Sequence, residues 1–301
     1  MNVVPRLAAA LLLVAVVAPP AHAAFPGRNG TVGYAFSSFG GDMPPQREVT
    51  GIHPVIRCER TDGAATGGDC TTSEFGSPSY APSGRRLVFD AGRQLGLIGA
   101  GGAGLYLFPP VTTNDGDPAF SPDGRRIAFT GVNDRGGTDL FVYRLGSLFV
   151  RSIVQDAGEP AWSSQNEIAW VRDGNIYVSN WKGARRRWVT SGVSPDWSPG
   201  GSRLAFVRPS PNLTFEGIQG RMFTIGARGR GIKPAFPGVR DALTPVWSPN
   251  GRWLAFARPE SGIFAKRRDG RGRAVQVATS QRGSEGAFVA AFQPSWRPLP
   301  R

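Results

Sequence analysis

The chain repeats one short phrase six times, and this repeat constrains its fold more than any other feature. The phrase holds a proline, a variable residue and an aromatic residue, and it usually continues into Ser-Pro and a glycine turn. Successive prolines stand 35 to 50 residues apart, so the chain is an array of one supersecondary unit. The six copies lie at residues 78–84, 118–124, 160–164, 195–201, 245–251 and 294–298.

Each unit has the composition of short β-strands. In the second unit, the glycine turn leads into Ile-Ala-Phe at 127–129, and Leu-Phe-Val follows at 140–142 after a variable loop. These runs are rich in β-branched and aromatic residues and are bounded by Gly, Pro, Asn and Asp, as strands are. The repeat length matches one four-stranded blade, so the sequence predicts an all-β, six-bladed β-propeller.

The sixth unit is predicted to be split between the two ends of the chain. The last copy, 294–298, supplies only the first strand of a blade. Residues 31–36 and 55–58 resemble the following strands of the same unit. Pairing the C-terminal strand with these N-terminal strands would close the ring and remove two exposed sheet edges.

These residues resemble the TolB-like propeller repeat, whose blades carry Pro-Ala-Trp-Ser-Pro-Asp-Gly followed by an Ile-Ala-Phe strand. Residues 118–129 are nearly that pattern, and the resemblance extends over about residues 29–301. It implies a propeller fold, which hosts many activities. TolB itself has a separate α/β domain before its propeller, whereas here the repeats begin almost at once.

The first 23 residues have the pattern of a secretory signal peptide. Arg6 precedes an apolar segment at 7–18 that is too short to span a bilayer, and Ala21-His22-Ala23 forms a small-x-small cleavage site. We therefore expect a propeller domain at 24–301 that is secreted or held in the cell envelope of a bacterium. No other segment has the length and hydropathy of a membrane span.

The two cysteines, Cys58 and Cys70, flank a turn signal between two candidate strands. In an oxidising compartment, this pair predicts a disulfide that would contribute roughly 2–3 kcal/mol. The alternative is two free thiols. A metal site is not expected, because no histidine or further cysteine clusters with them.

The formal net charge is +13, and nearly all of the positive charge is arginine. In a four-stranded blade the first and third turns lie on one face, and there the basic residues gather. Most acids fall in the opposite loops: Asp90, Asp115, Asp117, Asp134, Asp139, Asp156, Glu159, Glu216, Asp241, Glu260 and Glu285. The candidate binding residues of the basic face are Arg185, Arg186, Arg187, Arg267, Arg268, Arg271 and Arg273. The alternative is that arginine serves only solubility.

Catalytic signals are sparse. His53 is the only histidine after the leader, no nucleophile elbow occurs, and no cofactor site is expected. Loop carboxylates leave two alternatives open: a carboxylate-pair enzyme acting on polysaccharide, and a calcium site at Asp134 and Asp139 or at Asp115 and Asp117. The repeated aromatics are predicted to be core, and exposed aromatics are sought among Trp181, Trp188, Phe215 and Phe236.

The sequence thus favours a secreted, non-enzymatic propeller that binds a protein or an anionic component of the envelope. We expect a monomer with no transmembrane segment and no specific recognition of nucleic acid. The alternatives are a polysaccharide hydrolase or lyase that uses loop carboxylates, and a subunit of an envelope complex with a role similar to that of TolB.

Overall fold

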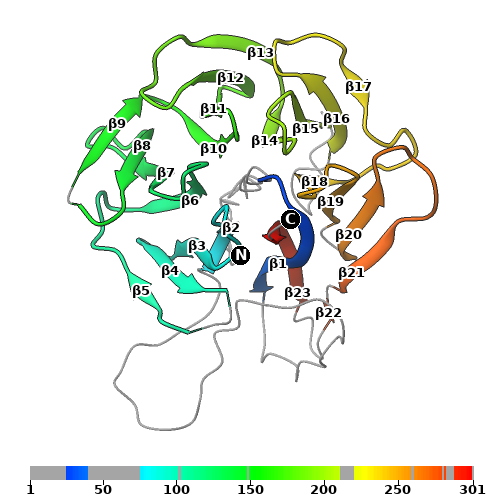
Figure 1. Ribbon diagram of the computed structural model, residues 1–301, viewed down its shortest axis with the longest axis horizontal. Coiled ribbons are helices and arrows are strands. Elements are labelled where there is room, and N and C mark those ends of the chain that lie inside the picture. Colours follow the sequence, from blue (N-terminus) through cyan, green and yellow to red (C-terminus); the bar gives the residue numbers. More distant parts are fainter. Residues whose placement is uncertain are drawn as a thin grey trace, which may run out of the picture.

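The protein is an all-β propeller. The computed structural model describes residues 25–39, 75–100, 103–147, 149–210, 220–258, 261–279, 281–282 and 288–299, and all of their regular secondary structure is β-strand. Five four-stranded antiparallel sheets are arranged around a common centre, like blades (Figure 1). No helix in these ranges could cross a membrane.

Each blade is a meander in which consecutive strands pair, with the first strand nearest the centre (Figure 1). Blade 1 contains β2 (Phe75–Tyr80), β3 (Arg86–Ala91), β4 (Leu95–Gly99) and β5 (Tyr106–Leu107). Blade 2 contains β6 (Asp115–Phe120), β7 (Arg126–Val132), β8 (Thr138–Arg144) and β9 (Val150–Val154). Blade 3 contains β10 (Gly158–Trp162), β11 (Glu167–Arg172), β12 (Asn175–Asn180) and β13 (Arg187–Ser191).

The remaining two blades follow the same plan. Blade 4 contains β14 (Val193–Trp197), β15 (Arg203–Pro209), β16 (Gly220–Gly226) and β17 (Lys233–Pro234). Blade 5 contains β18 (Leu243–Trp247), β19 (Trp253–Arg258), β20 (Gly262–Arg267) and β21 (Val275–Thr279). Because neighbouring strands are antiparallel, the first and third turns of every blade lie at one end of the sheet and the second turn at the other.

A sixth sheet, here called the terminal sheet, joins the two ends of the chain. It contains β1 (Arg28–Phe39), β23 (Phe288–Leu299) and the short β22 (Gln281–Arg282). β1 and β23 pair antiparallel, from Arg28 opposite Leu299 to Phe39 opposite Phe288. The described structure therefore has five four-stranded blades and a three-stranded sheet, rather than the six blades predicted. The further strand expected at 55–58 lies outside the described residues.

The glycine of the repeated phrase forms the first turn of its blade. In four blades this glycine has a φ of 65° to 67°, a left-handed conformation that side chains adopt only at a cost. Blade 3 has Asn166 there instead, at a φ of 63°. Asparagine tolerates this conformation, and the Asn166 Oδ1 accepts a hydrogen bond from the Trp162 Nε1 at 2.9 Å.

The aromatic residue of the phrase is part of the hydrophobic core, as predicted. Its side chain is at most 2% exposed in all five blades, namely at Tyr80, Phe120, Trp162, Trp197 and Trp247. Most apolar clusters combine residues of two adjacent blades, as in the cluster of Trp197 with Val178 of blade 3 and Phe206 of blade 4. The core is therefore made between blades rather than within them.

Two of the off-pattern aromatics illustrate opposite outcomes. Trp188 on the outer strand β13 is 58% exposed, as expected. The expectation for Phe236 is wrong, because its side chain is buried. Phe236 follows β17 and packs between blades 4 and 5, where its ring lies 6.1 Å from that of Phe256 of blade 5.

Candidate functional site

The innermost strands carry a polar residue directly before the proline of each phrase. These six residues, here called the axial bulge residues, are Ser77, Asp117, Glu159, Ser194, Thr244 and Gln293. All six have a positive φ, between 46° and 53°, which is a strained backbone conformation for residues other than glycine. In the five blades the pairing of the first and second strands shifts register at this point, as in a β-bulge.

Several axial bulge residues join neighbouring sheets through side-chain hydrogen bonds. The Gln293 Oε1 of β23 accepts from the Ser77 backbone N–H of blade 1 at 2.7 Å, and its Nε2 donates to the Ser77 Oγ at 3.0 Å. The Ser77 hydroxyl donates in turn to the Asp117 Oδ1 of blade 2 at 2.6 Å. The Glu159 Oε2 of blade 3 accepts from the Ser194 N–H of blade 4 at 2.5 Å.

The residue after the proline adds a second set of links. The Asp196 Oδ2 of blade 4 accepts from the Trp247 backbone N–H of blade 5 at 2.6 Å. The Ser79 Oγ of blade 1 accepts from the Phe120 N–H of blade 2 at 3.4 Å. Polar side chains near the axis therefore hold adjacent blades together. They form hydrogen bonds with buried backbone groups that would otherwise have no partner.

Burial changes the acidity of the carboxyl groups at the axis. Desolvation raises the pKa of Glu159 to about 8, and the nearby charge of Asp117 adds to this effect. Desolvation also raises the pKa of Asp117 to about 6, against the hydrogen bonds from Ser77 and Thr130. The pKa of the fully buried Asp196 is raised well above its ordinary value for the same reason. Burial therefore favours the neutral form of Glu159 and Asp196, whereas Asp117, with a pKa of about 6, is still mostly ionised at pH 7.

The loop carboxylates named as calcium candidates cap their own turns. The Asp115 carboxylate accepts from the Val111 N–H at 2.6 Å and from the Thr112 N–H at 2.9 Å. The Asp139 Oδ1 accepts from the Asn133 Nδ2 at 2.8 Å and from the Asp156 N–H at 3.1 Å. In the part of the chain that the structure describes, no group of three or more metal-ligating side chains comes together.

The predicted basic face is formed by the first and third turns, and we call it the arginine-rich face. Many of its cations are exposed, with Arg85, Arg125, Arg252 and Arg268 among them. The opposite face is less acidic than its sequence suggests, because Asp115, Asp139 and Glu159 are buried. Among the described residues of that face, the exposed carboxyls are Asp134, Asp156 and Asp173, and they share these loops with exposed arginines such as Arg93, Arg135 and Arg240.

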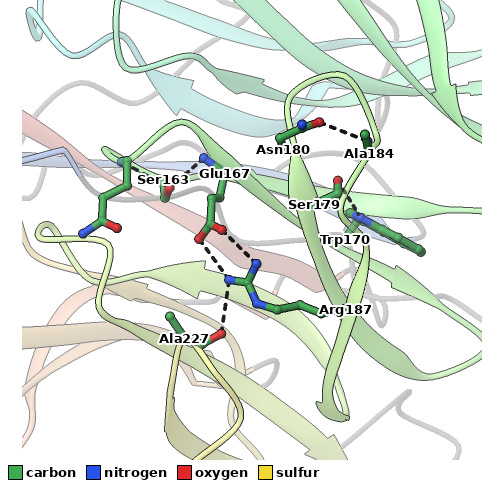
Figure 2. A network of polar contacts seen from close by, with 9 residues as sticks. Ser163, Glu167, Trp170, Ser179, Asn180, Ala184, Arg187 and Ala227 are labelled. Carbon is green, nitrogen blue, oxygen red and sulfur yellow. Dashed lines mark hydrogen bonds and ion pairs between the residues drawn. The ribbon is translucent and has the colours of Figure 1, made fainter.

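Two of the candidate arginines are engaged in holding the blades. Figure 2 shows Arg187 facing Glu167, and its guanidinium pairs with both carboxylate oxygens at 2.8 and 3.0 Å. The same guanidinium reaches the Ala227 carbonyl of blade 4 at 3.4 Å (Figure 2). Arg186 donates to the Gly183 carbonyl at 2.7 Å and to the Ile153 carbonyl of blade 2 at 3.1 Å. These contacts fit a structural role for both residues.

The third turn of blade 5 holds the densest group of free cations. Arg267 forms an ion pair with Asp269 at 2.8 Å, and this hydrogen bond lowers the pKa of Asp269 to about 2. Arg268, Arg271 and Arg273 are exposed, and none of them forms an ion pair with the described residues. Arg185 in the corresponding turn of blade 3 is exposed and equally unpaired.

The axial bulge residues escaped the sequence analysis, although one signal for them was available. Each is the residue before the repeated proline, and five of the six are Ser, Thr, Asp or Glu. Asp117 and Glu159 were instead assigned to the loops of the opposite face. Cys58, Cys70, Phe215 and the leader at 1–23 lie outside the described residues.

The repeat and the fold together define a β-propeller, and its fold is similar to that of TolB structures. No protein-family model and no curated protein matches the chain. Among solved structures, TolB from Acinetobacter baumannii superposes with a TM-score of 0.59 at 17% identity, over 74% of this chain and 57% of that one. The putative TolB from Agrobacterium tumefaciens gives a TM-score of 0.59 at 16% identity, over 75% and 91%.

The same fold occurs in an enzyme. Oligogalacturonate lyase from Vibrio parahaemolyticus superposes with a TM-score of 0.52 at 10% identity, over 70% of this chain and 67% of that one. At these levels of identity the likeness concerns the fold alone. The chain spans little more than half the length of the Acinetobacter baumannii protein, so activity has to be argued from this chain's own residues.

Proposed function

We propose that the chain is an exported, non-enzymatic binding module that docks an anionic polymer of the cell envelope on its arginine-rich face. The observation that carries this proposal is a set of exposed cations at the third turns that form no ion pair with the described residues: Arg185, Arg268, Arg271 and Arg273. A surface of several like charges concentrates and steers a polyanion, even though each exposed charge contributes little by itself.

A rigid disc suits such docking, and we further propose that the terminal sheet completes the ring as its sixth blade. Two contacts support this arrangement. The Arg297 Nε donates to the Gly84 carbonyl of blade 1 at 2.7 Å, and the Gln293 Oε1 accepts a hydrogen bond from the Ser77 N–H of the same blade. On the other side, Val32 and Tyr34 of β1 share an apolar cluster with Ile263 of blade 5.

Two turn glycines offer a matched test of this closure. A Cβ at Gly84 would stand 1.9 Å from the Pro298 carbonyl oxygen of β23, whereas a Cβ at Gly124 would meet no atom closer than 3.6 Å. Both glycines have nearly the same positive φ. Gly84→Ala should therefore lower the melting temperature much more than Gly124→Ala. Equal losses would mean that β23 is not seated against blade 1.

Export and the Cys58–Cys70 disulfide are part of the same proposal. The leader pattern at 1–23 directs the chain to an oxidising compartment, where an isolated cysteine pair forms a disulfide. Mass measurement of the alkylated protein, with and without a reductant, tests this pairing. Two alkylated cysteines in the unreduced sample would contradict it.

Docking is tested by retention on immobilised polyphosphate and on heparin over a range of salt concentrations. Replacing Arg185, Arg271 and Arg273 with serine should weaken retention and flatten its dependence on salt, because fewer counterions are released. The matched control replaces three exposed arginines of the opposite face, Arg93, Arg135 and Arg240. Equal loss in both triple variants would show that only the net charge matters.

Two alternative functions have separate tests. Raised carboxyl pKa values are typical of general acids, so Asp117 and Glu159 keep a polysaccharide hydrolase or lyase as the second candidate. Cleavage of an acidic polysaccharide that Glu159→Gln abolishes would support this enzyme. A TolB-like role in an envelope complex rests on the shared propeller alone. Capture of envelope proteins that survives the loss of the three face arginines would favour that role.

A further inference from the structure

A cavity opens on the arginine-rich face between blades 4 and 5. Its volume is about 460 Å³, and its wall contains the first turns of both blades. The third turn of blade 5 contributes Arg268, and residues 26–27, just before β1, complete the wall. The first turn of a blade connects its innermost strand to the next strand (Figure 1). Because two first turns line the cavity, it lies toward the axis.

The lining of the cavity is cationic and polar. It includes the guanidinium-bearing Arg203 and Arg268, the serines Ser198 and Ser202, and Asn250. None of the described residues that line it is acidic. Two arginines and neutral hydrogen-bonding residues in the wall of one recess are the residue types that recognise an oxyanion.

The two arginines are held in different ways. Arg203 is half-buried, and its Nη2 donates to the Thr224 Oγ1 at 3.2 Å and to the Gly231 carbonyl at 3.3 Å, which fixes the side chain. Arg268 has its guanidinium carbon 5.9 Å from the centre of the Trp247 ring. No hydrogen bond or ion pair to the described residues uses the Arg268 guanidinium, so its donors are available to a ligand.

A second observation concerns Trp247, which forms part of the cavity wall. Its indole Nε1–H is buried and has no hydrogen-bond partner among the described residues. The equivalent indoles in other copies of the phrase are bonded: Trp162 to Asn166, Trp197 to the Ala161 carbonyl and Trp296 to the Gly30 carbonyl. A buried donor without a partner is rare in folded proteins. Blade 5 therefore differs from its neighbours beside the cavity.

The sequence of the blade 4 turn also departs from the repeat at this place. Blade 2 has Asp123 before its turn glycine, where the carboxylate accepts from the Arg125 N–H and pairs with Arg126. Blade 5 has Asn250 at the same position, and blade 4 has Gly200, which lines the cavity. The glycine leaves the recess without the negative charge that the repeat carries in blade 2.

We propose that this cavity binds the phosphate group of a polyol phosphate, with Arg203 and Arg268 as the principal cationic contacts. The inference rests on the proposed function and deepens it, because a polymer of such units would lie across the arginine-rich face with one phosphate in the recess. A planar guanidinium matches two phosphate oxygens at once. Serine and asparagine side chains around the recess suit the hydroxyl groups of the polyol.

Glycine 200 offers a test by a matched pair of substitutions. A Cβ at Gly200 meets no atom within 4 Å, and the equivalent turns of blades 2 and 5 carry Asp and Asn. Gly200→Asp adds a negative charge beside the cavity, and Gly200→Asn adds a side chain of the same shape without charge. Calorimetric titration with glycerol 3-phosphate should show binding to the unaltered protein and to Gly200→Asn. The Asp variant should bind about tenfold more weakly or not at all.

Further measurements distinguish a phosphate ester from free phosphate, and the cavity proposal from the docking proposal. Arg268→Gln should weaken binding in the same titration, whereas Arg271→Ser with Arg273→Ser should leave it unchanged while reducing retention on polyphosphate. If inorganic phosphate binds as tightly as glycerol 3-phosphate, the cavity recognises the free ion and not the polyol ester. Absence of binding to the unaltered protein, or equal binding by both Gly200 variants, would overturn the cavity proposal. Loss of salt-dependent retention alone would overturn only the docking proposal.

Discussion

The axis and the arginine-rich face use charged side chains in opposite ways. At the axis, Glu159 and Asp196 are buried and Asp117 is partly buried. All three have raised pKa values and bond to groups of the neighbouring blades. On the face, Arg271 and Arg273 are exposed and have no ionic partner among the described residues. The difference teaches that the same kind of group serves two purposes in this fold. At the axis a carboxyl group bonds one blade to the next, whereas on the face an arginine remains charged and open to solvent.

The largest effect should come from breaking the axial links at the terminal sheet. A chain that ends at Phe292 loses Gln293, the Trp296 bond to the Gly30 carbonyl and the Arg297 bond to the Gly84 carbonyl. It also leaves the first part of β1 without its partners, from Arg28 opposite Leu299 to Gly33 opposite Ser295. Thermal unfolding followed by circular dichroism should shift far downward or lose cooperativity. An unchanged, cooperative melt would mean that the two ends do not hold each other.

The second effect concerns pH. Burial raises the pKa of Glu159 to about 8, whereas the same carboxyl in the unfolded chain titrates near its ordinary value of about 4. The stabilising contribution of the neutral form is therefore complete below about pH 4 and is lost as the pH rises towards 8. One unit of pKa shift corresponds to about 1.4 kcal/mol, so the free energy of unfolding should fall by a few kcal/mol over this interval.

Glu159→Gln provides the control for this prediction. Glutamine keeps an acceptor for the Ser194 N–H and cannot ionise, so the variant should be more stable than the parent at pH 8 and nearly equal to it at pH 4. Denaturant unfolding at a series of pH values measures the difference. The same pH slope in the parent and in the variant would show that Glu159 does not carry the effect. A smaller residual slope is expected from the other carboxyls with raised pKa values, Asp115, Asp117 and Asp196.

A smaller effect should separate two glutamines. Gln293 is buried at the axis, where Gln293→Ala leaves the Ser77 N–H without its acceptor and should cost about 1–3 kcal/mol. Gln276 on the outer strand β21 is exposed and donates one hydrogen bond to the Ser261 carbonyl at 2.7 Å. Gln276→Ala should cost about 0.5 kcal/mol or less. Similar free energies of unfolding for the two variants would remove the distinction between axis and rim.

The smallest effect on stability is expected on the arginine-rich face. Arg271→Ser and Arg273→Ser should change the free energy of unfolding by no more than about 0.5 kcal/mol, because both side chains are exposed and unpaired. Arg187→Ser should cost clearly more, since it breaks the pair with Glu167 and the bond to the Ala227 carbonyl. If all three substitutions cost the same, the division of the arginines into structural and docking residues fails.

The sequence was sufficient for the parts of the fold that repeat in phase. The phrase placed the core aromatics, the left-handed turn glycines and the first two strands of each blade, because local residues fix these features. It did not place the polar residues of the axis. From the sequence, Glu159 is predicted to be a loop acid one residue before a proline. Its side chain is buried because the pairing of β10 with β11 shifts register at this point.

The candidate site was predicted only in outline for a related reason. Which arginines remain free depends on partners that are distant in sequence. Glu167 and Arg187 stand 20 residues apart on strands that are not neighbours in the sheet, and no local pattern announces their pair. The cavity lies between two blades and involves residues before β1, so a reading of one repeat at a time could not find it.

The pairing of β1 with β23 has a consequence for how the molecule reaches its final state. Trp296 bonds to Gly30 across 266 residues, so almost the whole chain has to be synthesised before this contact can form. Contacts of such separation slow folding, since a large loop must be closed first. Until then β1 has an open edge that can pair with other chains. Assembly is therefore most vulnerable to aggregation at β1, and it is complete only when β23 is in place.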